Sequence, residues 1–132
     1  MSNKITLSSY TSKDREWLGN LLVEQDVRRF LPHLTTNVDK FICDMKIAEN
    51  NGLGKFWIIR LDSIGIGFIS IYDLTANPFI FYAVLPDFRN KGYMHNAIRL
   101  IENKYSLNLL TIVDNNNEAS MKILKDANIN IN

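Results

Sequence analysis

The chain has 132 residues, the length of one domain, because a single hydrophobic core typically organises roughly 100–150 residues. Hydrophobic residues make up 46% of the sequence and aromatic residues 11%, so the chain can bury a core of its own. Fifteen Lys and Arg residues against fourteen Asp and Glu residues leave a net charge of +1, too balanced for broad neutralisation of nucleic-acid phosphates. We therefore expect a single domain over residues 1–132 and no nucleic-acid partner.

Cysteine and histidine are scarce in this sequence. Cys43 is the only cysteine, which excludes an internal disulfide, fits a reducing compartment and predicts inert core packing for that side chain. With only His33 and His95 as imidazoles, we expect no zinc cluster and no other metal. No stretch reaches the roughly 18 apolar residues of a membrane span, and no apolar signal region opens the chain. These features predict a cytoplasmic protein that does not enter a membrane.

The N-terminal third predicts a short strand followed by a helix. Residues 5–8 alternate between apolar and polar side chains, as in a half-buried strand. Thr11 and Asp14 have the spacing of a capping box, and apolar residues follow at helical spacing over residues 17–22. A strand that leads directly into a first helix is therefore expected.

A second helix is predicted after a chain break at Phe30–Pro32. Thr36 and Asp39 repeat the capping pattern, and an apolar stripe follows over residues 38–48 and ends near Gly52. This stripe indicates a helix that packs one face against the core.

The middle of the chain predicts an antiparallel meander. Residues 55–61 and 64–72 are rich in β-branched and aromatic side chains, and the two residues between them suit a hairpin. A third such run covers residues 79–85. Gly65 and Gly67 superficially suggest a dinucleotide fingerprint, but the third glycine is missing and a strand follows, so we interpret them as hairpin geometry or a bulge.

The C-terminal part alternates between helix and strand. The apolar spacing is helical from Gly92 to about residue 105, strand-like over 107–113 and helical again from about Asn117. A strand-helix-strand crossover of this kind is normally parallel and right-handed. The fold class predicted is thus α/β, with a mixed, mostly antiparallel sheet of about six strands and helices on both faces, and C-terminal strands that are shortened or missing.

A basic, glycine-containing loop joins the predicted strand over 79–85 to the helix that follows. The first N–H groups of a helix have no internal partner and carry the positive end of its dipole. Gly92 would let backbone approach a ligand, and Arg89 and Lys91 would add charge. This pattern suits a pyrophosphate, although an ordinary solvated turn between a strand and a helix has the same ingredients.

Three segments resemble the GCN5-related N-acetyltransferases, and in particular their ribosomal-protein-alanine acetyltransferase-like branch. Residues Arg89–Met94 are similar to the acetyl-CoA pyrophosphate loop of that family, which has Arg or Gln, two residues, Gly, one residue, then Gly or Ala; Met94 departs from the last position. Val27–Pro32 resembles a segment near the start of that branch, and Asn117–Leu124 resembles the helix that follows the strand matching 107–113. The resemblance covers residues 3 to about 129 in the right order.

The resemblance implies a site for acetyl-CoA as co-substrate. In the family, pantetheine enters a gap between the strands that match 79–85 and 107–113, and the resemblance implies that unpaired backbone groups of Ala83, Val84 and Leu85 pair with its amides. A nearby N–H polarises the thioester carbonyl. The cofactor-binding residues implied are Ala83, Val84, Leu85, Arg89, Asn90, Lys91, Gly92, Tyr93, Met94, Asn117 and Ser120.

The catalytic groups common in the family are not evident here. Every residue from 79 to 85 is uncharged, whereas many members place a Glu on this strand, and Tyr82 is its only titratable group. Leu124 stands where many members have a Tyr that acts as the general acid, and Asn128–Ile129 stands where they have a Gly-Phe pair. Tyr82 is therefore the only catalytic candidate, with core packing as its alternative. Glu24 and His33 are candidate acceptor contacts, and Asp26 could, like Glu24, bind or deprotonate an acceptor amine. The alternative for Glu24 and Asp26 is a solvated helix end, and for His33 a solvated loop.

The resemblance implies an N-acetyltransferase whose acceptor is a primary amine, either a protein N-terminus or a small amine. The alternative is a degenerate member of the family that binds CoA or a partner without efficient catalysis, and a third hypothesis is an unrelated phosphate-binding module. Only residues 128–132 follow the last predicted helix, so the strand over 107–113 would be a sheet edge. We expect a homodimer that covers this edge, or a monomer with a more open cleft.

Overall fold

A computed structural model of the chain describes residues 4–72 and 79–105. These residues form one sheet of four strands in the order β1-β2-β3-β4, and each strand is antiparallel to its neighbour. The strands and helices are β1 (Ile5–Ser8), α1 (Arg15–Leu22), α2 (Gln25–Phe30), α3 (Val38–Asn50), β2 (Gly54–Leu61), β3 (Ile64–Tyr72), β4 (Phe79–Val84) and α4 (Tyr93–Tyr105), with short 3-10 helices η1 (Ser12–Asp14) and η2 (Pro86–Phe88).

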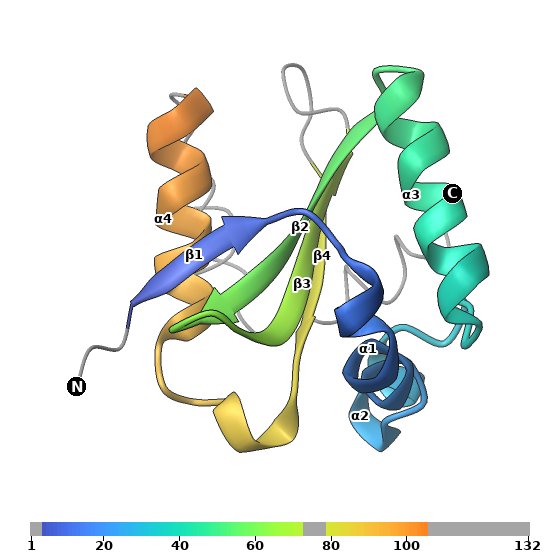
Figure 1. Cartoon of the computed structure of the whole chain (residues 1–132), viewed down its shortest axis with the longest axis horizontal. Coiled ribbons are helices and arrows are strands. Elements are labelled where there is room, and N and C mark those ends of the chain that lie inside the picture. Colours follow the sequence, from blue (N-terminus) through green and yellow to red (C-terminus); the bar gives the residue numbers. More distant parts are fainter. Residues whose placement is uncertain (1–3, 73–78, 106–132) are drawn as a thin grey trace.

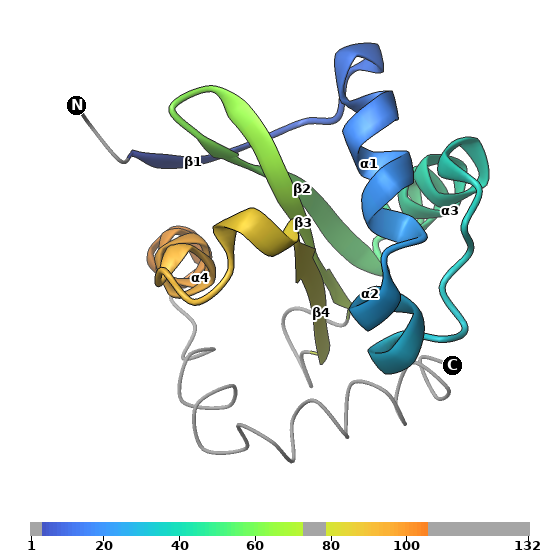
Figure 2. The ribbon, with the colours of Figure 1, turned by 90° about the horizontal axis from the view of Figure 1, so that it is seen from below.

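The sheet lies between two layers of helix (Figure 1). Helix α4 covers one face, and α1, α2 and α3 cover the other, as the view along the sheet shows (Figure 2). The predicted α/β class, with helices on both faces of a mostly antiparallel sheet, is confirmed. The strand expected over 107–113, the helix expected from Asn117 and residues 128–132 lie outside the described residues.

The predicted hairpin between β2 and β3 is confirmed. Asp62 and Ser63 form its two-residue loop with φ values of 49° and 78°, the left-handed pair that matches the twist of a hairpin. The register shifts by one residue opposite Gly65 and Gly67, which confirms the bulge. A Cβ at Gly67 would lie 2.3 Å from the carbonyl oxygen of Ala83, so only glycine allows β4 to pair this closely.

The predicted capping box at the start of the first helix is confirmed. The Thr11 N–H donates to Asp14 at 2.8 Å, and the Asp14 N–H donates to the Thr11 carbonyl at 2.9 Å. The second cap was predicted wrongly, because Asn37 rather than Thr36 caps α3. The Asn37 side chain accepts from the Lys40 N–H at 3.0 Å. Asn is at least as good an N-cap residue as Thr, so the helix begins one residue later than a cap at Thr36 would place it.

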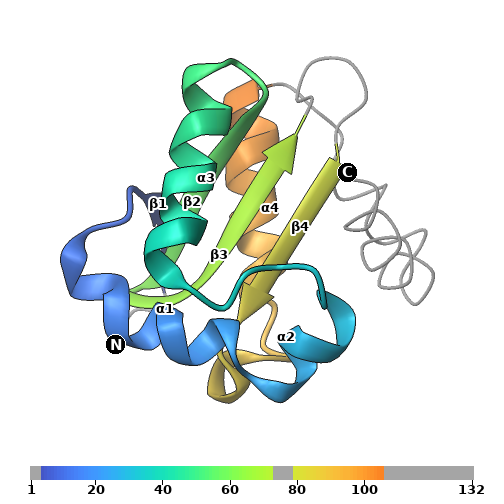
Figure 3. The same ribbon diagram turned by 90° about the vertical axis from the view of Figure 1, so that its right-hand side faces the viewer.

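Helix α2 is absent from the sequence-based prediction, which expects only a chain break at Phe30–Pro32. Glu24 is its N-cap, and the carboxylate accepts from the N–H groups of Asp26 at 3.0 Å and Val27 at 3.3 Å. Six residues are too few to show a helical apolar stripe, so the capping interaction is the main local reason that this helix forms. The helix lies beside one end of β4, in front of the sheet in Figure 3.

Two hydrophobic clusters fill the space between the sheet and its helices. One joins β2, β3 and β4 to α1, α2 and α3 through residues such as Leu21, Phe41 and Phe68. The other joins the opposite face to α4, where Ala97, Ile98 and Ile101 are buried as the predicted helical stripe requires. Cys43 belongs to neither cluster. The prediction of core packing for it is wrong, because its position on α3 faces solvent.

Candidate functional site

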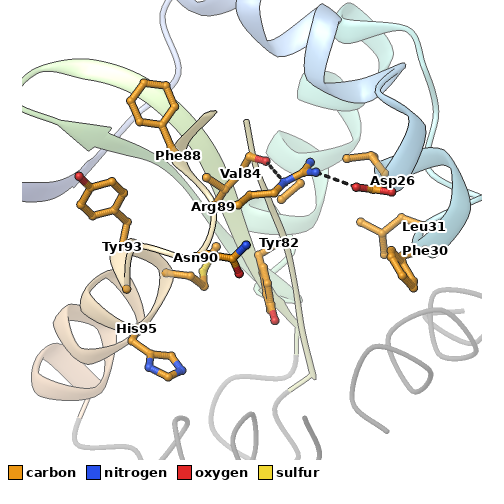
Figure 4. Close-up of a pocket in the computed structure, with 14 residues that line it drawn as sticks. Asp26, Phe30, Leu31, Tyr82, Val84, Phe88, Arg89, Asn90, Tyr93 and His95 are labelled. Atoms are coloured by element: carbon orange, nitrogen blue, oxygen red, sulfur yellow. Dashed lines mark hydrogen bonds and ion pairs between the residues drawn. The ribbon is translucent and has the colours of Figure 1, made fainter. Parts of the chain in front are cut away.

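A cavity of about 460 Å³ lies between α2 and the segment that runs from β4 to the start of α4. Phe30 and Leu31 form the α2 side, Asn90 and His95 lie across from them, and Tyr82 lies between the two sides (Figure 4). The residues that line the cavity are Asp26, Val27, Phe30, Leu31, Tyr82, Ala83, Val84, Phe88, Arg89, Asn90, Gly92, Tyr93, Met94 and His95. The cavity therefore combines apolar walls with the start of a helix.

The start of α4 forms one end of this cavity. Asn90 and Gly92 have φ values of 62° and 79°, a left-handed conformation that Gly adopts freely and Asn tolerates better than most residues. The first helical hydrogen bond runs from the Asn96 N–H to the Gly92 carbonyl at 3.1 Å, so the N–H groups of the preceding turn have no acceptor within the helix. Among the described residues, no atom lies within 4 Å of a Cβ built on Gly92, so none of them crowds these donors on that side.

Strand β4 contributes backbone groups to the same cavity. The Leu85 N–H donates to the Ile66 carbonyl at 2.8 Å, and antiparallel hydrogen-bonded pairs alternate along a ladder. The backbone groups of Ala83 and Leu85 therefore face β3, while those of Tyr82 and Val84 face away from it. The prediction of unpaired backbone groups is therefore wrong for Ala83 and Leu85, whose groups face β3. The outward-facing pair consists of Tyr82 and Val84.

Arg89 turns its guanidinium toward α2 and the sheet. Nε donates to the Val84 carbonyl at 2.8 Å, Nη1 donates to Asp26 at 2.9 Å, and Nη2 donates to Glu24. The first two bonds are drawn in Figure 4. Two carboxylates of the chain therefore neutralise the Arg89 guanidinium, and the contact of Arg89 with a phosphate stays a prediction. The exposed Lys91 beside it carries no such ion pair in the described residues.

The environment of Glu24 favours its ionised form. Burial by itself would raise the pKa of this carboxyl, but hydrogen bonds from Arg89 and from the Asp26 and Val27 N–H groups outweigh burial and lower the pKa. Asp26 is more exposed and accepts from Arg29 as well as from Arg89. Glu24 is therefore ionised at neutral pH, and both carboxylates are paired with arginine side chains, which leaves neither as an obvious base.

Most of the predicted site residues lie together in this cavity. Eight of them line it, namely Tyr82, Ala83, Val84, Arg89, Asn90, Gly92, Tyr93 and Met94. Leu85 and Lys91 adjoin the cavity, and Glu24 reaches it only through Arg89. His33 is exposed in the turn after α2 and does not line it. Asn117 and Ser120 lie outside the described residues.

Sequence reasoning did not include six lining residues among the site residues. Val27, Phe30 and Leu31 lie within the segment already noted for its resemblance, so that segment was the available signal. Phe88 carries no distinctive pattern, Asp26 is weighed only as an acceptor contact or base against a solvated helix end, and the position of His95 one turn inside the helix favours solvation over catalysis. In the structure His95 is exposed on the first turn of α4, at the rim of the cavity.

Within residues 4–72 and 79–105, no group of three or more His, Cys, Asp and Glu side chains is arranged to hold a metal ion. No helix in the same residues is both long and apolar enough to cross a membrane.

A family model described as an acetyltransferase (GNAT) domain matches residues 4–129, which is nearly the whole sequence. The chain belongs to the GNAT acetyltransferase family. The cavity of this GNAT domain thus lies beside the loop that resembles the pyrophosphate loop of the family. No curated protein matched the sequence.

Solved structures with the same fold include other acetyltransferases. A protein described as a probable acetyltransferase is 23% identical with a TM-score of 0.63, and the match covers 80% of this chain and 64% of that chain. A microcin C7 self-immunity acetyltransferase in complex with acetyl-CoA and AMP is 21% identical with a TM-score of 0.61. That match covers 79% of this chain and 63% of the acetyltransferase. RimL, a ribosomal L7/L12 alpha-N-protein acetyltransferase in complex with coenzyme A, is 15% identical with a TM-score of 0.64. That match covers 79% of this chain and 64% of RimL. This GNAT chain therefore spans slightly less than two thirds of the length of each.

Proposed function

We propose that this chain binds acetyl-CoA in the cavity between α2 and the β4–α4 segment and transfers the acetyl group to a primary amine. The observation that carries the proposal is the juxtaposition, in a member of the GNAT family, of outward-facing backbone on β4 with open space at the start of α4. Two proteins of the same fold hold acetyl-CoA or coenzyme A.

The cavity suits the parts of this co-substrate in turn. Its apolar side walls match the stem of a pantetheine arm, and the outward N–H of Val84 offers a donor for an amide or thioester carbonyl. The N–H groups of the first turn of α4, which have no acceptor within the helix, and the positive end of the helix dipole favour a pyrophosphate, and the exposed Lys91 adds charge nearby. Asn117 and Ser120 remain proposed contacts outside the described residues.

The reaction would be attack of a neutral amine on the thioester carbon, with the carbonyl oxygen held by backbone donors. The incoming ammonium must first lose a proton. Among the described residues, Asp26 is the only carboxylate that lines the cavity, and it is paired with two arginines. Tyr82 is the proposed contact for the reacting groups, and the acceptor is either a protein N-terminus, as the name of RimL describes, or a small amine.

The second candidate function is that of a degenerate GNAT module that binds CoA or a partner without efficient turnover. The observation that favours it is the lack of a carboxylate on β4 together with the paired state of Asp26 and Glu24. Family membership leaves no place for the third hypothesis, that of an unrelated phosphate-binding module.

One experiment separates the two candidates. The release of free CoA thiol from acetyl-CoA is measured across a panel of peptide N-termini and small amines, beside melting curves with and without CoA. Thiol release that depends on an amine supports the enzyme, and a raised melting temperature without turnover supports the binding module. No thiol release and no change in melting temperature would contradict both.

A further inference from the structure

The two walls of the cavity are joined by a cluster of three charged side chains, Glu24, Asp26 and Arg89, which we call the clasp. Glu24 and Asp26 lie at the start of α2, and Arg89 lies between β4 and α4, more than sixty residues later in the sequence. The α2 wall carries Phe30 and Leu31, and the opposite wall carries the loop at the start of α4. The clasp therefore spans the cavity, and two of its members, Asp26 and Arg89, belong to the lining.

Arg89 is fixed at both ends of its guanidinium. Nε is bound to the Val84 carbonyl, which anchors the group to the last residue of β4, while Nη1 and Nη2 reach the two carboxylates of α2. The backbone N–H of Arg89 also donates to the Pro86 carbonyl at 3.2 Å. A planar guanidinium held through all three nitrogens has little freedom to rotate. Asn90, the first left-handed residue of the loop, follows it directly.

Glu24 is the better placed of the two carboxylates. Its side chain is 19% exposed against 42% for Asp26, so its interaction with Arg89 is less screened by water. Asp26 divides its oxygens between Arg89 and the exposed Arg29. Glu24 also accepts the first N–H groups of α2, so one carboxylate fixes the helix and holds Arg89.

We propose that Glu24 is a positioning residue for the cofactor loop: by holding Arg89 it sets the separation of α2 from the β4–α4 wall and the placement of residues 90–92. This inference rests on the proposed function, and it assigns to Glu24 a role other than acceptor contact. It also assigns the side chain of Arg89 to the protein rather than to the phosphates. Loss of the Glu24 charge should let the guanidinium move and the two walls separate, without removing any group that touches the cofactor.

The variant Glu24→Gln tests the proposal, because the amide oxygen keeps an acceptor for the helix cap while the charge is lost. The matched control is Asp39→Asn, which removes an ion pair with Arg15 whose side chains are 70% and 62% exposed and which lies away from the cavity. We expect the affinity for CoA, measured by calorimetry, to fall about tenfold in Glu24→Gln and to stay within about twofold in Asp39→Asn. Equal CoA affinity in the wild type and Glu24→Gln would overturn the proposal.

Kinetics distinguish positioning from general weakening of the fold. For an amine that the wild type acetylates, Glu24→Gln should raise the KM for acetyl-CoA about tenfold and lower kcat less than about threefold. A positioning role that acts on cofactor placement affects the KM, whereas an equal loss of kcat in both variants at unchanged KM would contradict it.

A third measurement stands apart from CoA binding and so separates failure of this inference from failure of the proposed function. Amide hydrogen exchange without ligand should be faster in Glu24→Gln over residues 25–31 and 88–95, and unchanged there in Asp39→Asn. If the wild type binds no CoA, the proposed function fails, and this exchange pattern still decides whether the clasp holds the walls together. Unchanged exchange in both segments would overturn the clasp even if CoA binds.

Discussion

Replacement of Gly92 by Ala separates the role of the cofactor loop from the stability of the fold. The residue has a φ value of 79°, and no atom of residues 4–72 and 79–105 lies within 4 Å of a Cβ built on it, so the added methyl meets no clash with these residues. The left-handed conformation should still cost about 1–2 kcal/mol of unfolding free energy for any residue with a Cβ. In the complex the methyl would lie beside the phosphates. Loss of one hydrogen bond to a charged group, about 1.5–3 kcal/mol, would weaken acetyl-CoA binding roughly 10- to 150-fold.

Gly52 provides a control with the same backbone cost. Its φ value is 72°, an added Cβ would likewise have no atom within 4 Å, and the residue lies just after α3, away from the cavity. Gly52→Ala and Gly92→Ala should therefore lower the melting temperature by similar amounts, a few degrees each. Calorimetric titration with acetyl-CoA should detect weaker binding only in Gly92→Ala. Equal affinity in the two variants would refute the location of the phosphate site at the start of α4.

Three further predictions concern stability and chemistry. Burial alone would raise the pKa of Asp14, but hydrogen bonds from Arg60, the Thr11 N–H and Trp17 outweigh it and lower the pKa to about 2. About 2 kcal/mol of stability should therefore be present above pH 4 and be lost as the pH falls toward 2. In Asp14→Asn, chemical denaturation at neutral pH should show an unfolding free energy lower by about 3 kcal/mol, and this free energy should depend little on pH between 4 and 2. The same fall in stability with acid as in the wild type would contradict the assignment of that fall to Asp14. Gly67→Ala should destabilise the fold by at least about 2 kcal/mol, because its Cβ would lie 2.3 Å from the Ala83 carbonyl oxygen, and a melting temperature within a degree of the wild type would contradict that contact. The rate of acetyl transfer should rise with pH toward the free pKa of the acceptor amine, because β4 has no carboxylate to act as a base. A bell-shaped pH profile with a limb near neutrality that disappears in Asp26→Asn would instead identify Asp26 as a base and contradict this prediction.

Local patterns in the sequence predict most of the fold. The hairpin at Asp62 and Ser63, the capping box at Thr11 and Asp14 and the apolar stripe of α4 each depend on residues within a few positions of one another. Such patterns set backbone geometry directly, so the strands and longer helices follow from them. Helix α2 was missed because its six residues are too few for a periodic pattern.

The candidate site is only partly predictable, because many of its contacts join residues that are far apart in the sequence. The loop at Gly92 has a recognisable local pattern, and its place at the end of the cavity was expected. The carboxylate partners of Arg89 are more than sixty residues away, and the carboxylate partner of Arg60, Asp14, lies 46 positions away. Nothing in the sequence distinguishes an arginine that binds phosphate from one that neutralises two carboxylates of its own chain. The direction of the β4 backbone groups likewise depends on the ladder with β3, which places Val84 rather than Leu85 toward the cavity.

Amide hydrogen exchange of the wild-type chain, compared with and without saturating CoA, tests the central claim most directly. The claim is that CoA lies along the outward edge of β4 with its phosphates at the start of α4. It predicts slower exchange on binding at Val84 and over residues 90–95, with no change in the hairpin loop at Asp62 and Ser63. Binding of CoA without slower exchange in either cavity segment would contradict the claim.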